Sequence, residues 1–177
     1  MIDTRIETER LLLRGFSLAD APRVAEICSN EKLHRGTYLP YPYTLAEAEA
    51  WLAERDADFA NKVCYDFAVV EKSSGILFGC VGAYHNAERQ NASLGYWLDE
   101  AFWGRGYATE AAGALLQWLF TLDDVHKVCA DHFGFNTASG RVMQKIGLTY
   151  EGTQREQVYR DGVYHDLVFY GAIKPER

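Results

Sequence analysis

Apolar residues recur with two different periods along the chain, and each change of period marks a new element. Apolar and polar positions alternate over residues 6–16, which predicts a first strand. The spacing lengthens to three and four residues over 17–29, which predicts a helix capped at its first residue, a serine. Thr44 and Glu47 have the spacing of a capping box and predict a second helix that ends near Asn61.

Strand-like alternation returns after this second helix. Residues 65–71 and 76–84 flank a polar turn and predict an antiparallel hairpin. The apolar run 94–98 predicts another strand, and helical spacing over 106–122 separates it from a strand at 127–133. We expect this strand–helix–strand unit to be parallel and right-handed.

The last part of the chain contains one more helix and one more hairpin. Asn136 is placed to cap a short helix, and Gly147 is placed to end it. Residues 148–158 and 163–173 then predict a second hairpin. The predicted order is β-α-α-β-β-β-α-β-α-β-β, an α/β fold of the mixed α+β kind. We expect a single domain over residues 1–177.

The turn Trp103-Gly104-Arg105-Gly106 interrupts the pattern between the 94–98 strand and the following helix. Two glycines allow a sharp bend and close approach of a ligand to the backbone. The first turn of a helix also presents unpaired N–H groups and the positive end of the helix dipole. These features favour an anion-binding site, to which Arg105 adds a charge.

Composition narrows the class of protein. The chain has 177 residues, 48% of them hydrophobic, and a formal net charge of −7, which argues against a general nucleic-acid binder and suits a cationic substrate. Cys28, Cys64, Cys80 and Cys129 are widely spaced and are expected to be reduced core residues. The charged N-terminus and the lack of a long apolar run predict a cytoplasmic protein with no membrane partner.

Several short motifs in a fixed order identify the family that the chain resembles. They are T-E-R-L-L-L-R from Thr8, L-G-Y-W-L from Leu94, W-G-R-G-Y-A-T-E-A from Trp103, N-x-x-S from Asn136, K-I-G-L from Lys145 and Y-R-D-G-V-Y-H-D from Tyr159. Together they resemble the GNAT superfamily of acetyl-CoA-dependent N-acetyltransferases. The likeness is greatest to the Rim-type (RimJ/RimL-like) branch, which acetylates N-termini of ribosomal proteins. Trp103 replaces the usual Gln or Arg of the superfamily's phosphate loop, as it does in that branch.

The resemblance implies a GNAT fold, a mostly antiparallel mixed sheet in which one parallel pair of strands splays apart to hold coenzyme A. The backbone of residues 104–109 would hold the pyrophosphate, and the splayed strand would hold the pantetheine arm. No metal is implied. The implied cofactor-binding residues are Tyr96, Trp97, Leu98, Trp103, Gly104, Arg105, Gly106, Tyr107, Ala108, Thr109, Asn136 and Ser139.

The chemistry of acetyl transfer asks for a proton donor and, in some enzymes, a base. By resemblance, Ser139 would protonate the departing thiolate, although its hydroxyl could instead bond within its own helix. The base is left open between His85, Glu156 and a water chain. Glu110 is expected to pair with Arg10 or Arg14 from the first strand and to take no part in catalysis.

Alternatives remain for the ligand and for the acceptor. The alternative ligand of the glycine turn is a dinucleotide, but G-x-G-x-x-T from Gly104 is an incomplete dinucleotide motif and lacks the expected acidic residue. The acceptor is expected to be a protein N-terminal amine. The alternative acceptors are a small amine, a polyamine or an amino acid. Alternatively, the protein is a non-catalytic sensor that binds acyl-CoA. Specificity would lie in residues 38–43, 85–91 and 159–165. A homodimer is also expected.

Overall fold

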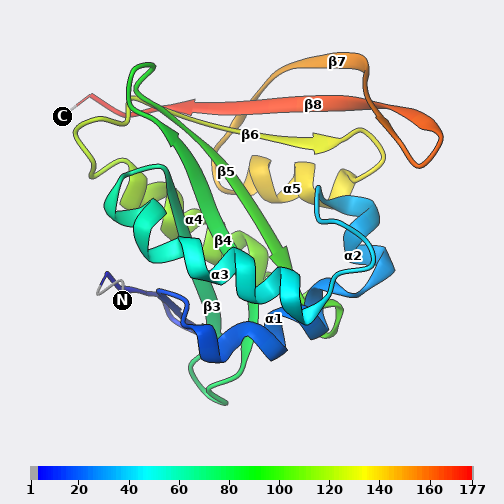
Figure 1. The fold of residues 1–177 in the computed structure, drawn as a ribbon. Coiled ribbons are helices and arrows are strands. Elements are labelled where there is room, and N and C mark those ends of the chain that lie inside the picture. Colours follow the sequence, from blue (N-terminus) through cyan, green and yellow to red (C-terminus); the bar gives the residue numbers. More distant parts are fainter. Residues whose placement is uncertain (1–3, 177) are drawn as a thin grey trace.

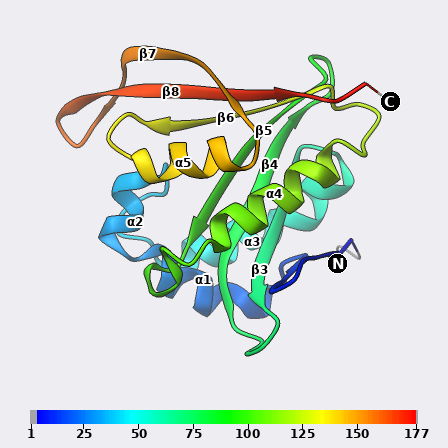
Figure 2. The same ribbon diagram turned by 180° about the vertical axis from the view of Figure 1, so that it is seen from behind.

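The computed structural model describes residues 4–176, which form one eight-stranded mixed sheet with helices on both faces (Figures 1 and 2). The strand order is β1-β2-β3-β4-β5-β6-β8-β7. The strands are β1 (Ile6–Glu7), β2 (Leu11–Arg14), β3 (Cys64–Glu71), β4 (Leu77–Asn86), β5 (Asn91–Leu98), β6 (Lys127–Phe133), β7 (Thr149–Arg160) and β8 (Val163–Ile173). The helices are α1 (Ala21–Cys28), α2 (Glu31–Gly36), α3 (Leu45–Ala60), α4 (Tyr107–Leu119) and α5 (Thr137–Lys145), with short 3-10 turns at Leu18–Asp20 and Glu100–Phe102.

Helices α1 and α3 cover one face of the sheet, while α4 and α5 cover the other (Figures 1 and 2). Each face has its own apolar core. Leu115 and Leu119 of α4 are fully buried in the larger core, and Val24 and Ala48 are fully buried in the smaller one. The sheet is mixed and mostly antiparallel, as expected, because among the described residues only β5 and β6 pair parallel. Within residues 4–176, no helix is long and apolar enough to cross a membrane.

The N-terminal part departs from the predicted elements in two ways. The first strand is split into β1 and β2, which pair antiparallel, because Thr8 turns the chain by accepting a hydrogen bond from Leu11 N at 2.9 Å. The first helix begins later than predicted, since a 3-10 turn precedes α1 and Pro22 lies in the first turn of α1. The single domain expected over 1–177 includes residues 1–3 and 177, which lie outside the described residues.

The predicted middle of the chain is confirmed closely. The Thr44 hydroxyl accepts from Glu47 N, and Glu47 Oε2 accepts from Thr44 N, so the capping box starts α3 as expected. Strands β3 and β4 form the predicted hairpin. Asn136 accepts from Ser139 N at the start of α5. Gly147 follows α5 in the left-handed conformation, with φ at 95°.

Strands β5 and β6 are the parallel pair, and they separate soon after they meet. Their register covers only Asn91–Ser93 against Lys127–Cys129, although β5 continues to Leu98 and β6 continues along β8 to Phe133. Beyond Ser93, β5 pairs with β4 alone. The sheet thus opens into a gap between β5 and β6, which is the splay that the family resemblance implies.

Candidate active site

The glycine turn connects the end of β5 to α4. Gly104 and Gly106 have φ values of 74° and 80°, which side chains with a Cβ rarely adopt, and Gly106 is the N-cap of α4. The Trp103 indole donates to the main-chain oxygen of Leu98 at 2.8 Å and so fixes the turn against the strand. The N-cap and first residues of α4, from Gly106 to Thr109, line a pocket at the open end of the gap.

The edge of β5 that faces the gap has unpaired amides. Asp99 N donates to Phe78 O at 2.7 Å, on the β4 side of the strand. Successive N–H groups of a strand point to opposite sides, so the amides of Leu98 and Tyr96 point away from β4. A ligand in the gap can therefore bond to this edge as an added strand would.

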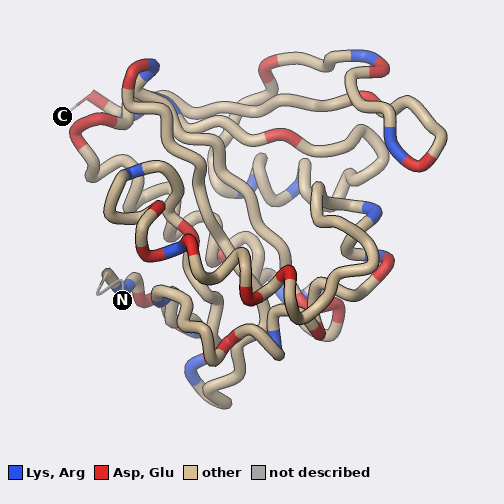
Figure 3. Tube along the Cα trace, viewed as in Figure 1, with Lys and Arg blue, Asp and Glu red and all other residues tan. Residues whose placement is uncertain are grey.

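The first pocket lies between the glycine turn, β5, α2 and α5, and we call it the glycine-turn pocket. Its volume is about 460 Å³. It is lined by all the predicted cofactor-binding residues except Arg105: Tyr96, Trp97, Leu98, Trp103, Gly104, Gly106, Tyr107, Ala108, Thr109, Asn136 and Ser139. Four cationic side chains also line it, Lys32 and Arg35 from α2 and Arg141 and Lys145 from α5. Figure 3 shows basic positions on both helices. The pocket is suited to a polyanionic ligand.

Arg105 lies in the glycine turn but does not line the glycine-turn pocket. It is exposed, and its guanidinium carbon lies 5.6 Å from the centre of the Phe102 ring. Its main-chain oxygen accepts from Arg10 at 3.0 Å. Since Arg105 does not line the glycine-turn pocket, the cations of α2 and α5 are better placed to contact a phosphate there.

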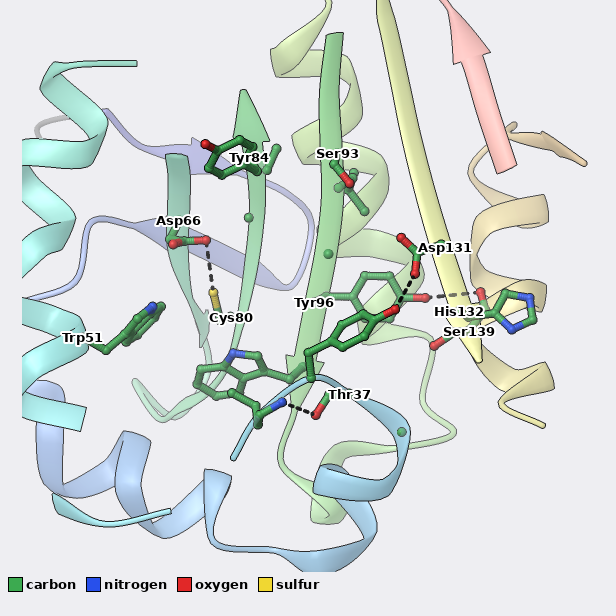
Figure 4. Close-up of a pocket in the computed structure, with 18 of the residues that line it drawn as sticks. Thr37, Trp51, Asp66, Cys80, Tyr84, Ser93, Tyr96, Asp131, His132 and Ser139 are labelled. Carbon is green, nitrogen blue, oxygen red and sulfur yellow. Dashed lines mark hydrogen bonds between the residues drawn. The ribbon is translucent and has the colours of Figure 1, made fainter. Parts of the chain in front are cut away.

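The second pocket lies on the α3 side of the gap, and we call it the aromatic pocket (Figure 4). Its volume is about 630 Å³. The aromatic residues that line it are Tyr38, Tyr43, Trp51, Tyr84, Tyr96, Trp97 and Phe133. Glu47, Asp66 and Asp131 also line it, and no Lys or Arg among the described residues does. Its acidic lining is the reverse of the basic lining of the glycine-turn pocket.

The two pockets meet at Tyr96, Trp97 and Ser139, together with Gly36 and Thr37 of the α2 end. The Tyr96 hydroxyl donates to Ser139 O at 3.2 Å (Figure 4). Burial raises the pKa of Tyr96 to about 12, so the hydroxyl keeps its proton. The Ser139 hydroxyl has no hydrogen bond within residues 4–176, so the alternative of a bond within its own helix is not what the structure shows.

Asn136 has a structural role in addition to lining the glycine-turn pocket. Its Oδ1 accepts from Ser139 N at 3.3 Å, and its Nδ2 donates to Gly36 O at 3.1 Å. The side chain thus joins the start of α5 to the end of α2. A Cβ on Gly36 would lie 3.0 Å from Asn136 Nδ2, so a larger residue here would push on the Asn136 side chain.

The two predicted candidates for a base lie outside both pockets. His85 has a fully buried side chain, and its ring nitrogens lie 2.9 Å from Lys62 O and 3.2 Å from Asp124 O. Glu156 is exposed at a bulge of β7 with φ at 52°, and its N donates to Asp166. The structure does not support either residue as a base, because neither lines the cavity in which an acceptor would bind.

Glu110 pairs with Arg10, as one of the two predicted alternatives stated. Its carboxylate accepts from Thr8 Oγ1 at 2.5 Å, Arg10 N at 2.9 Å and Arg10 Nε at 2.7 Å. Burial raises the pKa of Glu110, but these hydrogen bonds outweigh burial and hold the pKa below its ordinary value. Arg14 pairs with Asp20 instead. Glu110 therefore links α4 to the β1–β2 turn.

The four cysteines are free thiols, as the sequence predicted. Burial raises the pKa of Cys28 to about 12, so this thiol is protonated at neutral pH. No three His, Cys, Asp or Glu residues in the described part of the chain are grouped to hold a metal ion. Neither observation adds a reactive centre to the two pockets.

One wall of the aromatic pocket is the segment after α2, and a distant hairpin holds it. Arg160, at the end of β7, donates to the main-chain oxygens of Thr37 and, at 3.1 Å, Leu39. The His34 ring contacts the same guanidinium. The β7–β8 hairpin therefore contributes to the shape of the aromatic pocket, although its own strands lie at the far edge of the sheet.

Sequence reasoning missed α2 and hence the cations that it carries. The signals are present: Asn30 accepts from Lys32 N and Leu33 N as an N-cap, and a glycine ends the helix. Only Leu33 is buried, so the six-residue helix has no apolar period to detect. Arg141 and Lys145 were missed because their importance depends on the position of α5 beside the gap.

Comparisons with known proteins agree with this geometry. Residues 10–149 match the family model described as an acetyltransferase (GNAT) domain. The chain is 26% identical over 171 residues to the N-acetyltransferase YoaA of Bacillus subtilis, covering 96% of this chain and 97% of that protein. It is 25% identical to the [ribosomal protein uS5]-alanine N-acetyltransferase of Escherichia coli, covering 97% and 92% of the two chains.

A solved structure of RimL, the ribosomal L7/L12 alpha-N-protein acetyltransferase, in complex with coenzyme A has a similar fold. Its TM-score is 0.86, with 21% identity over 96% of this chain and 98% of that one. At this identity the likeness concerns the fold.

Proposed function

Because the chain belongs to the family of GNAT acetyltransferase domains, we propose that it transfers an acetyl group from acetyl-CoA to a primary amine, the N-terminal amine of a protein. The observation that carries this proposal is the meeting of two oppositely charged pockets at Ser139 and Tyr96. A polyanionic donor suits the basic side, and an amine, which is cationic in water, suits the acidic side. The proposed acceptor agrees with the activity named for the Escherichia coli relative.

Coenzyme A fits the residues that line the glycine-turn pocket. The α4 amides and the cations of α2 and α5 would hold its phosphates. The outward amide of Leu98 would hold its pantetheine arm along β5. When bound, acetyl-CoA supplies the activated acyl group as a thioester.

Two groups at the junction can assist the transfer. The outward amide of Tyr96 can donate to the acyl oxygen as negative charge develops there. The Ser139 hydroxyl, which has no partner of its own among residues 4–176, can give a proton to the thiolate as it leaves. The bond that forms joins the amine nitrogen to the acyl carbon as the acyl C–S bond breaks, and the proton lost by the amine passes through water in the aromatic pocket to restore the Ser139 hydroxyl.

The test is an assay of the purified protein with acetyl-CoA and short peptides that begin with alanine or serine. Thiol release measures the rate, and mass spectrometry locates the new acetyl group. We expect acetylation of the α-amine and none on a peptide whose α-amine is blocked. Acetylation confined to lysine side chains or to small amines would overturn the acceptor assignment. No thiol release with any amine would overturn the proposed transfer.

Three further proposals concern the state of the protein: a single domain over residues 1–177, a cytoplasmic location and a homodimer. Limited proteolysis tests the first, and a stable core much shorter than the chain would contradict it. Cell fractionation tests the second. Light scattering tests the third, and a mass near the 20.0 kDa of one chain would contradict it.

A further inference from the structure

Asp131 is a carboxylate of the aromatic pocket whose charge no cation neutralises. It lies on β6, two residues beyond the last pairing with β5, and its side chain is directed into the pocket (Figure 4). Its Oδ2 accepts from the Tyr38 hydroxyl at 3.1 Å. Within residues 4–176 it forms no ion pair with Lys or Arg, and its Oδ1 has no hydrogen-bond partner.

The other two carboxylates of the pocket are already bonded. Asp66 Oδ2 lies 2.5 Å from the guanidinium of Arg55, which is itself buried. Glu47 Oε2 accepts from Thr44 N at 2.5 Å as part of the capping box. Asp131 and Glu47 each keep one carboxylate oxygen without a hydrogen bond to residues 4–176, but only Asp131 neither pairs with an arginine nor caps a helix.

The surroundings of Asp131 make its charge costly without a ligand. Burial raises the pKa of Asp131, and the hydrogen bond from Tyr38 and the nearby His132 only partly offset burial. An ionised carboxylate taken out of water and left without a cation destabilises a fold. A cationic ligand at this point would recover the lost interaction.

The walls around Asp131 also suit a cation. The Tyr38 and Phe133 rings lie 5.1 Å apart, centre to centre, and both line the pocket. Aromatic faces attract cations, and this attraction increases where water is excluded. The Phe133 ring already has the Arg160 guanidinium carbon 5.8 Å from its centre, so the carboxylate and the Tyr38 ring are the groups that suit a further positively charged group.

We propose that Asp131, oriented by Tyr38, is the subsite that receives the acceptor's amino group in its protonated form, before the amine loses a proton and reacts beside Ser139. The inference rests on the proposed function and specifies its acceptor class: a free, cationic α-amine is selected over a neutral group of the same size. Asp131 is then the residue that determines this selectivity. Tyr38 acts through Asp131 and is a positioning residue.

The test measures binding without turnover, using two tetrapeptide probes and the protein saturated with coenzyme A. One probe begins with alanine, and the other begins with lactic acid, in which a hydroxyl replaces the ammonium group. Calorimetry gives a dissociation constant for each. We expect the natural protein to prefer the ammonium probe by about tenfold to a hundredfold, the range for a hydrogen bond to a charged group.

Three variants complete the test. Asp131→Asn should remove the preference, and Tyr38→Phe should reduce it. Asp123→Asn, the same chemical change at an exposed residue outside both pockets, should keep it. Each variant should keep its affinity for coenzyme A, which verifies that it is folded.

The outcomes separate this inference from the proposed function. An unchanged preference in Asp131→Asn overturns the subsite while leaving acetyl transfer intact. Equal binding of both probes to the natural protein overturns the subsite as well. If neither probe binds, the N-terminal acceptor class and the subsite both fail, while coenzyme A binding is measured separately.

Discussion

Tyr96 and Ser139 are joined across the gap between β5 and β6, where the Tyr96 hydroxyl donates to Ser139 O at 3.2 Å. This bond holds the first turn of α5 against β5 at the point where the two pockets meet. Because the main-chain oxygen of Ser139 is the acceptor, its hydroxyl stays available. The same bond therefore positions the proposed proton donor without using it.

Ser139→Ala should lower turnover by about a hundredfold, the low end of the range for proton transfer by a positioned group, because a thiolate is already a fair leaving group. Affinity for acetyl-CoA should hardly change, since the proton is needed only as the C–S bond breaks. Steady-state kinetics and calorimetry measure the two effects. Thr121→Ala removes an exposed hydroxyl after the end of α4, outside both pockets, and should leave turnover unchanged. Equal turnover in Ser139→Ala and Thr121→Ala would leave the thiolate to take its proton from water.

Arg141→Ala should weaken coenzyme A binding more than Arg105→Ala does. Arg141 lines the glycine-turn pocket, whereas Arg105 is exposed beside Phe102. We expect a loss of about tenfold for Arg141, at the low end for a charged hydrogen bond because the side chain is exposed to water. Calorimetry at two salt concentrations checks this, and the difference between the variants should shrink at the higher one. A larger loss in Arg105→Ala would restore the assignment that the sequence favoured.

Glu110→Gln should cost about 1–3 kcal/mol of unfolding free energy at pH 7 and leave the chemistry intact. The estimate is below that for a fully buried pair because the Arg10 side chain is 41% exposed. The folded pKa of Glu110 is lowered, so its charge stabilises the fold above the unfolded pKa, and this contribution is lost as pH falls through the folded pKa. Denaturant unfolding should therefore show the difference between the two proteins shrinking below about pH 4. A variant as stable as the natural protein but inactive would make Glu110 a catalytic residue.

Acetyl-CoA should raise the melting temperature, whereas NADP should not. A ligand at about a hundred times its dissociation constant stabilises the folded state by about 2.7 kcal/mol. The basic lining and the outward β5 amides favour the first ligand, whereas G-x-G-x-x-T from Gly104 is an incomplete dinucleotide motif for NAD or NADP. Thermal unfolding with each ligand is the measurement. An equal shift with NADP would contradict the assignment of the glycine-turn pocket.

The sequence predicted elements whose causes are local. Thr44 and Glu47 lie within one helical turn of each other, so their capping box can be found without knowing the fold. The glycine turn is local in the same sense, because Gly104 and Gly106 adopt positive φ values next to a helix start. The separation of β5 and β6 is predicted only from the family motifs, because no local sequence pattern indicates it.

The parts that escaped prediction depend on contacts between distant segments. His85 is a plausible base by type, but only the fold reveals that Lys62 and Asp124 enclose it. Asp131 carries no motif, and its role depends on Tyr38, which is 93 positions away. Titratable residues in a strand cannot be assigned to a cavity until the neighbours on each face are known.

The contact of Arg160 with Thr37 and Leu39 has a consequence for how this kind of protein diversifies. The wall of one cavity is held by a residue more than 120 positions later in the chain, while the glycine turn makes no use of that residue. Thr37 lines both pockets, but Leu39 lines the aromatic pocket alone. Changes in the length or sequence of the terminal hairpin can therefore alter the aromatic pocket at Leu39 with little change to the glycine-turn pocket. A protein of this kind could thus keep its pocket for the acyl donor while its pocket for the acceptor changes, because different parts of the chain hold the two walls.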